Sequence, residues 1–193
     1  MHITQFKKLA VIFGSALLLQ GCVAALIGGG AAAAKVGTDP RTVKSQYSDE
    51  KLEFQVYNAI EKDEQIKEEG RVVVVSYNAR ILLIGQLPNE SLKEVATGLA
   101  KGVEGVGDVY NEMRVGSPIT VETKAKDSWI TTKIKSNLLL NAEVKTTDVK
   151  VITENGEVFL MGDVTPSQAD AAATEASKVS GVKKVIKVFK YLN

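Results

Sequence analysis

The chain has little of the chemistry from which catalytic and metal sites are built. Its 193 residues include a single cysteine, Cys22, and a single histidine, His2, which lies at the extreme N-terminus. One cysteine excludes an intrachain disulfide. The two counts together leave no residues for a Cys-His pair, a Ser-His-Asp triad or a histidine-bearing zinc site in the body of the chain. We therefore expect a protein that is not an enzyme and that holds no metal or other cofactor.

The chain is also poor in aromatic residues, at 6%, and its 24 basic and 23 acidic side chains nearly cancel. Its composition, with 45% hydrophobic residues, is that of an ordinary folded protein of one or two small domains. An apolar run of eleven residues, Leu9–Leu19, follows Lys7 and Lys8. The run is too short for a membrane-spanning helix, which needs about 20 residues. A basic start followed by a short apolar stretch predicts a secretory signal.

The signal-like stretch ends at Leu19-Gln20-Gly21-Cys22, which resembles the bacterial lipobox. The resemblance implies that residues 1–21 are a signal peptide and that Cys22 is acylated and becomes the first residue of the mature chain. The same resemblance implies that an aspartate at the position of Val23 would favour the inner membrane, and that its absence favours the outer membrane. Residues 22–48, rich in alanine and glycine, are predicted to form a flexible tether. The competing interpretation leaves Cys22 as a free thiol beside an uncleaved anchor.

The body of the chain contains an internal repeat. Asp49-Glu50-Lys51-Leu52 aligns with Asp127-Ser128-Trp129-Ile130 at an offset of 78 residues, and Gly85 aligns with Gly162 at an offset of 77. A drift of this size is expected from single-residue deletions in loops of two otherwise equivalent units. The repeat predicts two domains, at residues 49–116 and 124–193, joined by a linker at 117–123.

Each unit shows the element order α-β-β-α-β. Apolar residues at a spacing of four predict the first helix, and Asn155-Gly156 between apolar runs predicts the hairpin of the second unit. Thr165-Pro166-Ser167-Gln168 predicts the start of the second helix of that unit. We expect an α+β fold in which a small three-stranded sheet carries both helices on one face.

This pattern resembles the BON domain, whose marks are a central hairpin that ends in an apolar-Gly pair and a Gly-Val pair after the second helix. A lipobox, a tether and two such units together resemble the DolP family of outer-membrane lipoproteins. The resemblance implies a lipid-anchored, periplasm-facing protein of the outer membrane. It also implies that the second unit binds anionic phospholipid, of the phosphatidylglycerol or cardiolipin type, and that the protein supports outer-membrane integrity and accumulates at the division site.

The near-neutral chain is polarised between its two units. Residues 49–116 carry a net charge of −5, whereas residues 124–193 carry +3. A basic surface attracts anionic lipid headgroups. It would also attract nucleic acid, but an exported lipoprotein does not normally meet nucleic acid, and no such partner is expected. The simpler interpretation is that the basic residues form a solvated face without a ligand.

The only tryptophan, Trp129, aligns with Lys51 of the first unit. A position where the repeat accepts lysine is expected to face solvent, and an exposed tryptophan beside lysines suits a membrane-water interface. The competing interpretation is that Trp129 packs against the first domain. Under the family resemblance, the predicted lipid-binding residues are Lys124, Lys126, Asp127, Ser128, Trp129, Ile130 and Lys133.

Two other functions remain open. In the first, both units dock on proteins, and the chain is a periplasmic adaptor for an envelope assembly complex, a role in which the acidic first unit would meet the protein partner. In the second, the chain is a hydrolase, although no pocket with a base and a nucleophile is evident from its residues.

Overall fold

The structure, a computed structural model, describes residues 43–193. The predicted signal peptide, the acylation of Cys22 and residues 23–42 of the predicted tether lie outside the described residues. Residues 41–193 form one compact unit that contains both repeats. Among residues 43–193, no helix has the length and apolarity that a membrane crossing requires.

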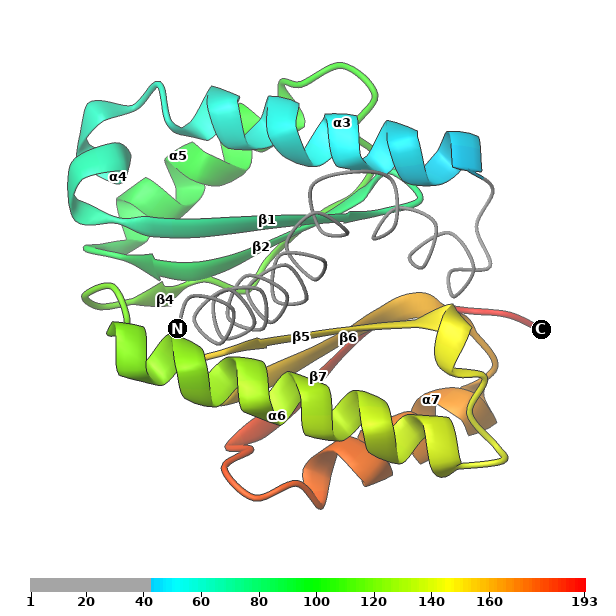
Figure 1. Ribbon diagram of the computed structural model, residues 1–193. Coiled ribbons are helices and arrows are strands. Elements are labelled where there is room, and N and C mark those ends of the chain that lie inside the picture. The colour runs from blue at the N-terminus through cyan, green and yellow to red at the C-terminus, as the bar shows by residue number, and fades with distance from the viewer. Residues whose placement is uncertain (1–42) are drawn as a thin grey trace, which may run out of the picture. The chain divides into compact units, whose positions relative to one another are not determined.

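The first repeat contains three helices and two hairpin strands, followed by a divided last strand (Figure 1). Its first helix begins at Val43, so residues 43–48, predicted as part of the tether, are helical instead. Burial of Gln46 and Asp49 explains why this turn is ordered. The elements are α3 (Val43–Ile60), α4 (Glu64–Glu69), β1 (Arg71–Tyr77), β2 (Arg80–Leu87), α5 (Glu90–Lys101), β3 (Val109–Asn111) and β4 (Arg114–Val115).

The second repeat has the predicted order α-β-β-α-β, with one added turn of 3-10 helix. Thr165 caps its second helix as predicted: the hydroxyl accepts the backbone N–H of Gln168, and the Gln168 side chain accepts the N–H of Thr165. The elements are α6 (Val121–Leu140), η1 (Thr146–Asp148), β5 (Val149–Glu154), β6 (Glu157–Val164), α7 (Pro166–Ser177) and β7 (Lys184–Tyr191).

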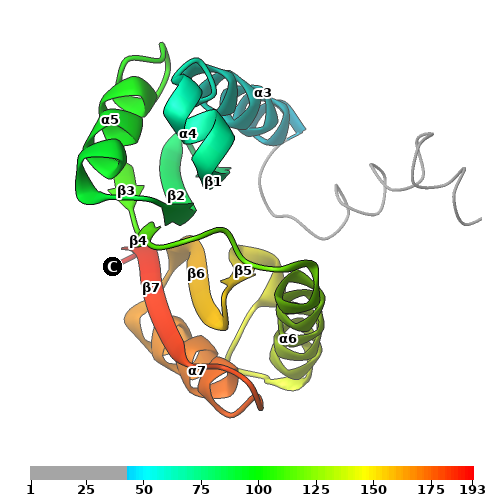
Figure 2. The same ribbon diagram turned by 90° about the vertical axis from the view of Figure 1, so that its left-hand side faces the viewer.

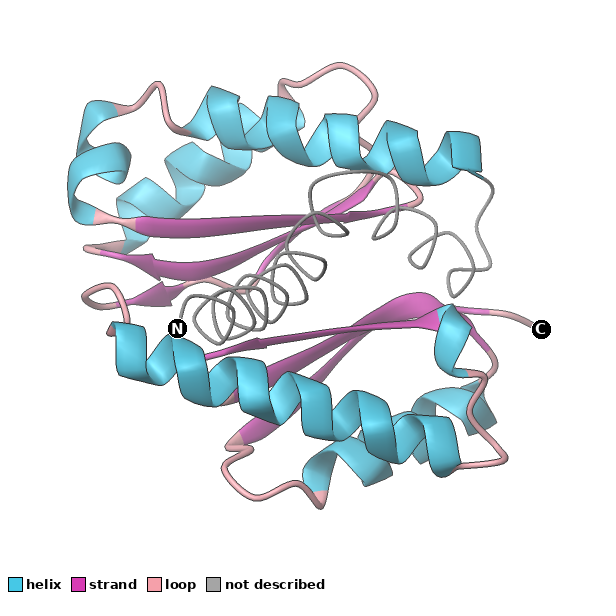
Figure 3. Cartoon of the chain, in the orientation of Figure 1, coloured by secondary structure: helices cyan, strands magenta, loops and turns pink. Residues whose placement is uncertain are grey.

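Each repeat is a small sheet with its long helices on one face, which confirms the predicted α+β fold (Figures 2 and 3). The hairpin is antiparallel, and the last strand runs parallel to the central strand. A separate apolar core fills the space between helices and sheet in each domain. The helices contribute residues at the spacing read from the sequence: Leu52, Val56 and Ile60 in the first core, and Ile130, Ile134 and Leu138 in the second.

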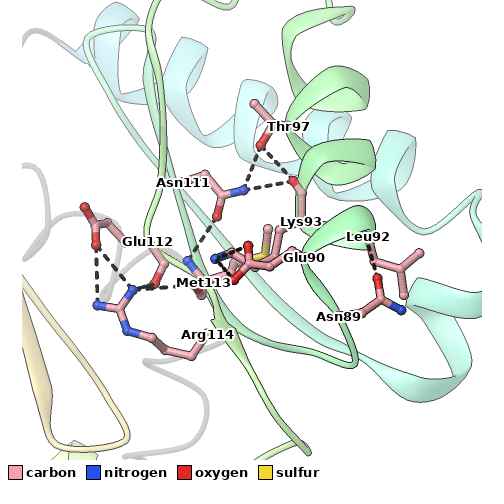
Figure 4. Close-up of polar contacts among 9 residues, drawn as sticks. All are labelled: Asn89, Glu90, Leu92, Lys93, Thr97, Asn111, Glu112, Met113 and Arg114. Carbon is pink, nitrogen blue, oxygen red and sulfur yellow. Dashed lines mark hydrogen bonds and ion pairs between the residues drawn. The ribbon is translucent and has the colours of Figure 1, made fainter.

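The last strand of the first domain is interrupted at Glu112–Met113, and Asn111 shows why (Figure 4). Its side-chain amide donates to the carbonyl of Lys93 at 2.9 Å and to the hydroxyl of Thr97 at 2.7 Å. Its side-chain oxygen accepts the N–H of Met113 at 3.0 Å. The strand is thereby tied to α5, and the side chain of Met113 turns into the core. The first sheet therefore has four strands, with β3 and β4 both paired to β2.

A third apolar core joins the two domains through the sheet faces that carry no helices. It contains residues of β1 and β2 from the first domain and of β6 and β7 from the second. The pattern of two helices on one face predicted a single core per domain and did not include this contact. The buried members are Val75, Tyr77, Leu82, Ile84, Phe159, Met161 and Val188.

Four ion pairs surround this shared core. Three use an arginine of the first domain and a carboxylate of the second, and the fourth reverses the signs. Of these, Arg71 and Glu154 form a two-point contact at 2.9 and 3.1 Å. The two repeats thus form one body with complementary charges at their junction. The four pairs are Arg71–Glu154, Arg80–Asp163, Arg114–Glu157 and Glu53–Lys150.

The glycine at the end of each hairpin run has a steric role. Gly85 has a φ of +124°, and a Cβ atom there would lie 2.0 Å from the carbonyl oxygen of Arg71. At the equivalent position of the second domain, a Cβ on Gly162 would lie 2.0 Å from the carbonyl oxygen of Asp148. The apolar-Gly pair that marks each repeat therefore reflects close approach of two backbones.

Gly98, in the middle of α5, is different, because a Cβ there would meet nothing within 4 Å. Gly98→Ala is expected to raise the free energy of unfolding by about 0.5–1 kcal/mol, since alanine restricts the unfolded chain and favours the helix. Urea denaturation of the residue 41–193 unit measures the change. Gly85→Ala is the control, with an expected change of opposite sign, and an unchanged or lower midpoint for Gly98→Ala would contradict the prediction.

Candidate functional site

The helix α6 carries the residues that the sequence singled out. Its N-terminus is capped by Thr120, whose hydroxyl accepts the N–H of Thr123 at 3.2 Å. Ile130, Ile134 and Leu138 recur every four residues and face the core of the second domain. The rest of the helix circumference is left for solvent, because a single apolar stripe covers only one side of a helix.

Trp129 lies on the outer side of α6, and its side chain is 55% exposed. The predicted exposure of this residue is confirmed. Lys51, at the equivalent position of α3, is exposed as well. The shared backbone position therefore faces solvent in both domains, and only the second domain fills it with a large apolar ring.

The outer side of α6 carries further apolar residues that the sequence analysis missed. Leu140 follows Trp129 by eleven residues, which is close to three helical turns, so both lie on the same side. Leu140 is 86% exposed, and Leu139 and Val121 are also largely exposed. A signal was present: the run Leu138-Leu139-Leu140 contains more leucines than one buried stripe can accommodate. These residues extend the apolar surface beyond the single indole.

The predicted lysines divide between two sides of the helix. Lys126 and Lys133 lie three residues before and four residues after Trp129, and therefore on its side. Lys126 pairs with Glu122 at 2.8 Å. This contact raises the pKa of Lys126 and lowers the pKa of Glu122. Lys133 has no ion-pair partner among residues 43–193.

Lys124 and Ser128 lie away from this side, in a groove between α6 and the edge strand β5. The groove encloses about 400 Å³, and the hydroxyl groups of Thr131 and Thr132 also line it. Lys124 precedes Trp129 by five residues, a turn of about 140° around the helix. The prediction that Lys124 lies with Lys126 and Lys133 beside Trp129 is therefore wrong for Lys124, because it used distance along the sequence and not the angle around the helix axis.

Asp127 is not on the surface, contrary to its predicted role in lipid contact. Its side chain is 5% exposed, and its two oxygens accept the backbone N–H groups of Asn155 at 2.7 Å and Gly156 at 2.8 Å. Asp49 makes the equivalent bonds to the turn of the first domain, with Asn78 and Ala79. The carboxylate holds the hairpin turn of each repeat against the first helix.

Ile130 is also withdrawn from the surface, at 4% exposed, and belongs to the core of the second domain. Of the predicted set, Lys126, Trp129 and Lys133 therefore share one outer surface, together with Leu140. We call these four residues the α6 face. Among the described residues, no three side chains of the types His, Cys, Asp and Glu are grouped as a metal site would require.

Comparison with known proteins agrees with this architecture. The model of the family described as the BON domain matches residues 48–117 and 126–193. The outer membrane lipoprotein DolP of Haemophilus influenzae is 64% identical over the whole length of both chains. The 21 kDa hemolysin of Actinobacillus pleuropneumoniae is 57% identical over 80% of this chain and 79% of its own. The osmotically-inducible protein Y of Escherichia coli is 35% identical over 64% of this chain and 59% of its own.

Proposed function

The chain belongs to the DolP family of outer-membrane lipoproteins with two BON domains, and we propose that it binds bilayers containing anionic phospholipid through the α6 face. In this proposal Cys22 carries the lipid anchor, and the two domains extend into the periplasm. Binding at the α6 face then supports the integrity of the outer membrane and biases where the protein accumulates, including the division site.

The observation that carries the proposal is the half-exposed ring of Trp129 at a position where the first domain has an exposed lysine. An indole at a membrane interface buries its ring among the lipids and keeps its N–H hydrated. Leu140 on the same side adds apolar area, and the unpaired ammonium group of Lys133 meets anionic headgroups.

The distribution of charge between the two domains also favours an orientation in which the second domain faces the bilayer. At the domain junction, three arginines of the acidic first domain form ion pairs with three carboxylates of the basic second domain. Glu53 of the first domain and Lys150 of the second domain form the fourth pair. When the charges in these four pairs are left out of the count, the net charge of the first domain changes from −5 to −7 and that of the second domain from +3 to +5. An anionic bilayer therefore attracts the second domain and repels the first.

A weak contact at the α6 face is sufficient for this role. A lipid anchor holds the domains near the bilayer, so the second contact forms at a high effective concentration. Its consequence is the orientation of the protein and its distribution among membrane patches of different composition.

Trp129→Ala is expected to weaken binding of the soluble unit of residues 41–193 to phosphatidylglycerol vesicles by about tenfold, because burial of one aromatic ring is lost. Vesicle flotation at low salt measures the change, and tryptophan fluorescence of the parent should shift to the blue when vesicles are added. Tyr110→Ala is the matched control, since it removes a partly exposed ring from the acidic domain. Equal binding by the parent and Trp129→Ala would reject the proposal. Absence of binding at low salt would favour the protein adaptor instead.

A further inference from the structure

The helix α3 of the first domain and Glu61, which directly follows it, carry three aromatic and two acidic residues along one outer side. They follow each other at spacings of three and four, which places them in one stripe. Tyr47 is 69% exposed and Phe54 is 66% exposed, and Tyr57 is also exposed. Partial desolvation and the neighbouring carboxylate of Glu61 raise the pKa of Tyr57. We call this set the α3 stripe: Tyr47, Glu50, Phe54, Tyr57 and Glu61.

A groove lies between the α3 stripe and the strand β1. It encloses about 380 Å³, and Phe54 and Tyr57 line one wall, with Val72–Val74 of β1 opposite. The carboxylates of Glu50 and Glu53 also line it. The groove is therefore apolar at its walls, the carboxylate of Glu53 beside it is paired with Lys150, and one of its sides is a strand backbone.

The strand β1 is an edge of its sheet, because it pairs only with β2. At the turn-proximal end of its outer edge, the backbone is already occupied: the N–H of Ser76 donates to Glu53 at 2.8 Å, and its carbonyl accepts from Lys150 at 3.2 Å. Alternate residues of an antiparallel strand direct their backbone groups to the same edge. The N–H and carbonyl groups of Val72 and Val74 therefore face outward beside the groove, in the geometry that an added strand needs.

The second domain shows that the fold does not require these aromatic rings. It has a groove between the equivalent elements α6 and β5, which Thr131 and Thr132 line together with Arg71 of the first domain. At the repeat offset of 78 residues, Phe54 corresponds to Thr132 and Tyr57 corresponds to Lys135. The first domain thus keeps two exposed rings at positions where an equivalent helix folds with a hydroxyl and an ammonium group.

We propose that the groove between α3 and β1 binds an extended, basic segment of a partner protein, which pairs with β1 as an additional strand. The backbone of Val72–Val74 supplies the strand pairing, and arginine or lysine side chains of the partner lie over Phe54 and Tyr57 and near the acidic residues of the α3 stripe. The net charge of the first domain selects a basic partner and disfavours an anionic bilayer on this side. This surface is separate from the α6 face and gives the protein a protein-binding function beside its membrane contact.

The test uses the full-length protein in nanodiscs of zwitterionic lipid and a blocked nine-residue peptide of alternating valine and arginine. The peptide is expected to slow amide hydrogen exchange in residues 71–77, and the fluorescence anisotropy of the same peptide with a dye at its N-terminus gives the affinity. The double variant Phe54→Thr with Tyr57→Lys carries the residues of the equivalent helix, so its fold is expected to be retained. It should weaken peptide binding by at least about tenfold, whereas Tyr110→Ala should leave it unchanged.

Three results with the peptide would each overturn the proposal: binding without protection of residues 71–77, equal binding of a peptide with glutamate in place of arginine, or equal affinity of the double variant. A dimer of the protein that forms without peptide, and that the double variant does not form, would also overturn the proposal. A second copy of the chain would then occupy the groove. Trp129→Ala should bind the peptide normally, and the double variant should bind phosphatidylglycerol vesicles normally. The two surfaces can therefore fail independently.

Discussion

Replacing Phe159 with alanine is expected to lower the free energy of unfolding of the residue 41–193 unit by about 3–5 kcal/mol. Phe159 is 1% exposed and lies on the central strand β6, with its side chain in the core shared by the two sheets. Its partners there include Tyr77 and Leu82 of the first domain. Removing the ring leaves a cavity between two sheets whose backbones are held by their own helices, so collapse around it is limited.

The position of this cavity predicts an additional effect. Because the ring joins the domains, Phe159→Ala should separate a single calorimetric transition into two and increase amide exchange on β1 and β2 as well as on β6. Phe189→Ala is the matched control, since Phe189 is a partly buried residue that packs against the core of the second domain and is not a member of the shared core. It should destabilise that domain without loosening the first. A loss below about 1 kcal/mol for Phe159→Ala would show that the shared core contributes little.

The local elements of the fold could be predicted from the sequence. The spacing of Ile130, Ile134 and Leu138, the Asn155-Gly156 turn and the cap at Thr165 each depend on neighbours a few residues away. The shared core depends on residues far apart in the chain. Its signal was nevertheless present: the strand sequences are apolar without alternation, as in Ile81–Ile84, and a strand of this kind is buried on both faces.

The site could be predicted only in part, for a similar reason. The exposure of Trp129 followed from its alignment with Lys51, since equivalent positions of a repeat share their environment. The same alignment pairs Asp127 with Asp49, and an acid shared at equivalent positions of a repeat indicates a structural role rather than a lipid contact. The side of the helix on which each lysine lies follows from its angle around the axis, and for Lys124 that angle leads into the groove beside β5.

Asp127→Ala is the second substitution with a large expected effect, a loss of about 3 kcal/mol in the free energy of unfolding. The carboxylate accepts two turn N–H groups, from Asn155 and Gly156, and the bond to Gly156 is fully buried. Hydrogen bonds to a charged group contribute more than neutral ones, and the amides left behind cannot all reach water. Thermal and urea denaturation of the 41–193 unit measure the loss.

Asp127→Asn is expected to lose less than alanine, because its amide oxygen can still accept one of the two N–H groups. Asp49→Ala should produce a similar loss through the turn of the first domain, where Asp49 accepts from Asn78 and Ala79 and also from the hydroxyl of Ser76. This parallel tests whether the two carboxylates have the same structural role in both repeats.

Binding to vesicles separates this role from lipid contact. At a temperature where Asp127→Ala remains folded, its affinity for phosphatidylglycerol vesicles should stay within about twofold of the parent, because the carboxylate does not reach the α6 face and a twofold change is well under 1 kcal/mol. Trp129→Ala should show the reverse, with stability retained and affinity lost. If Asp127→Ala were as stable as the parent but failed to bind vesicles, the carboxylate would act at the membrane surface, and the structural role derived from its two turn hydrogen bonds would be wrong.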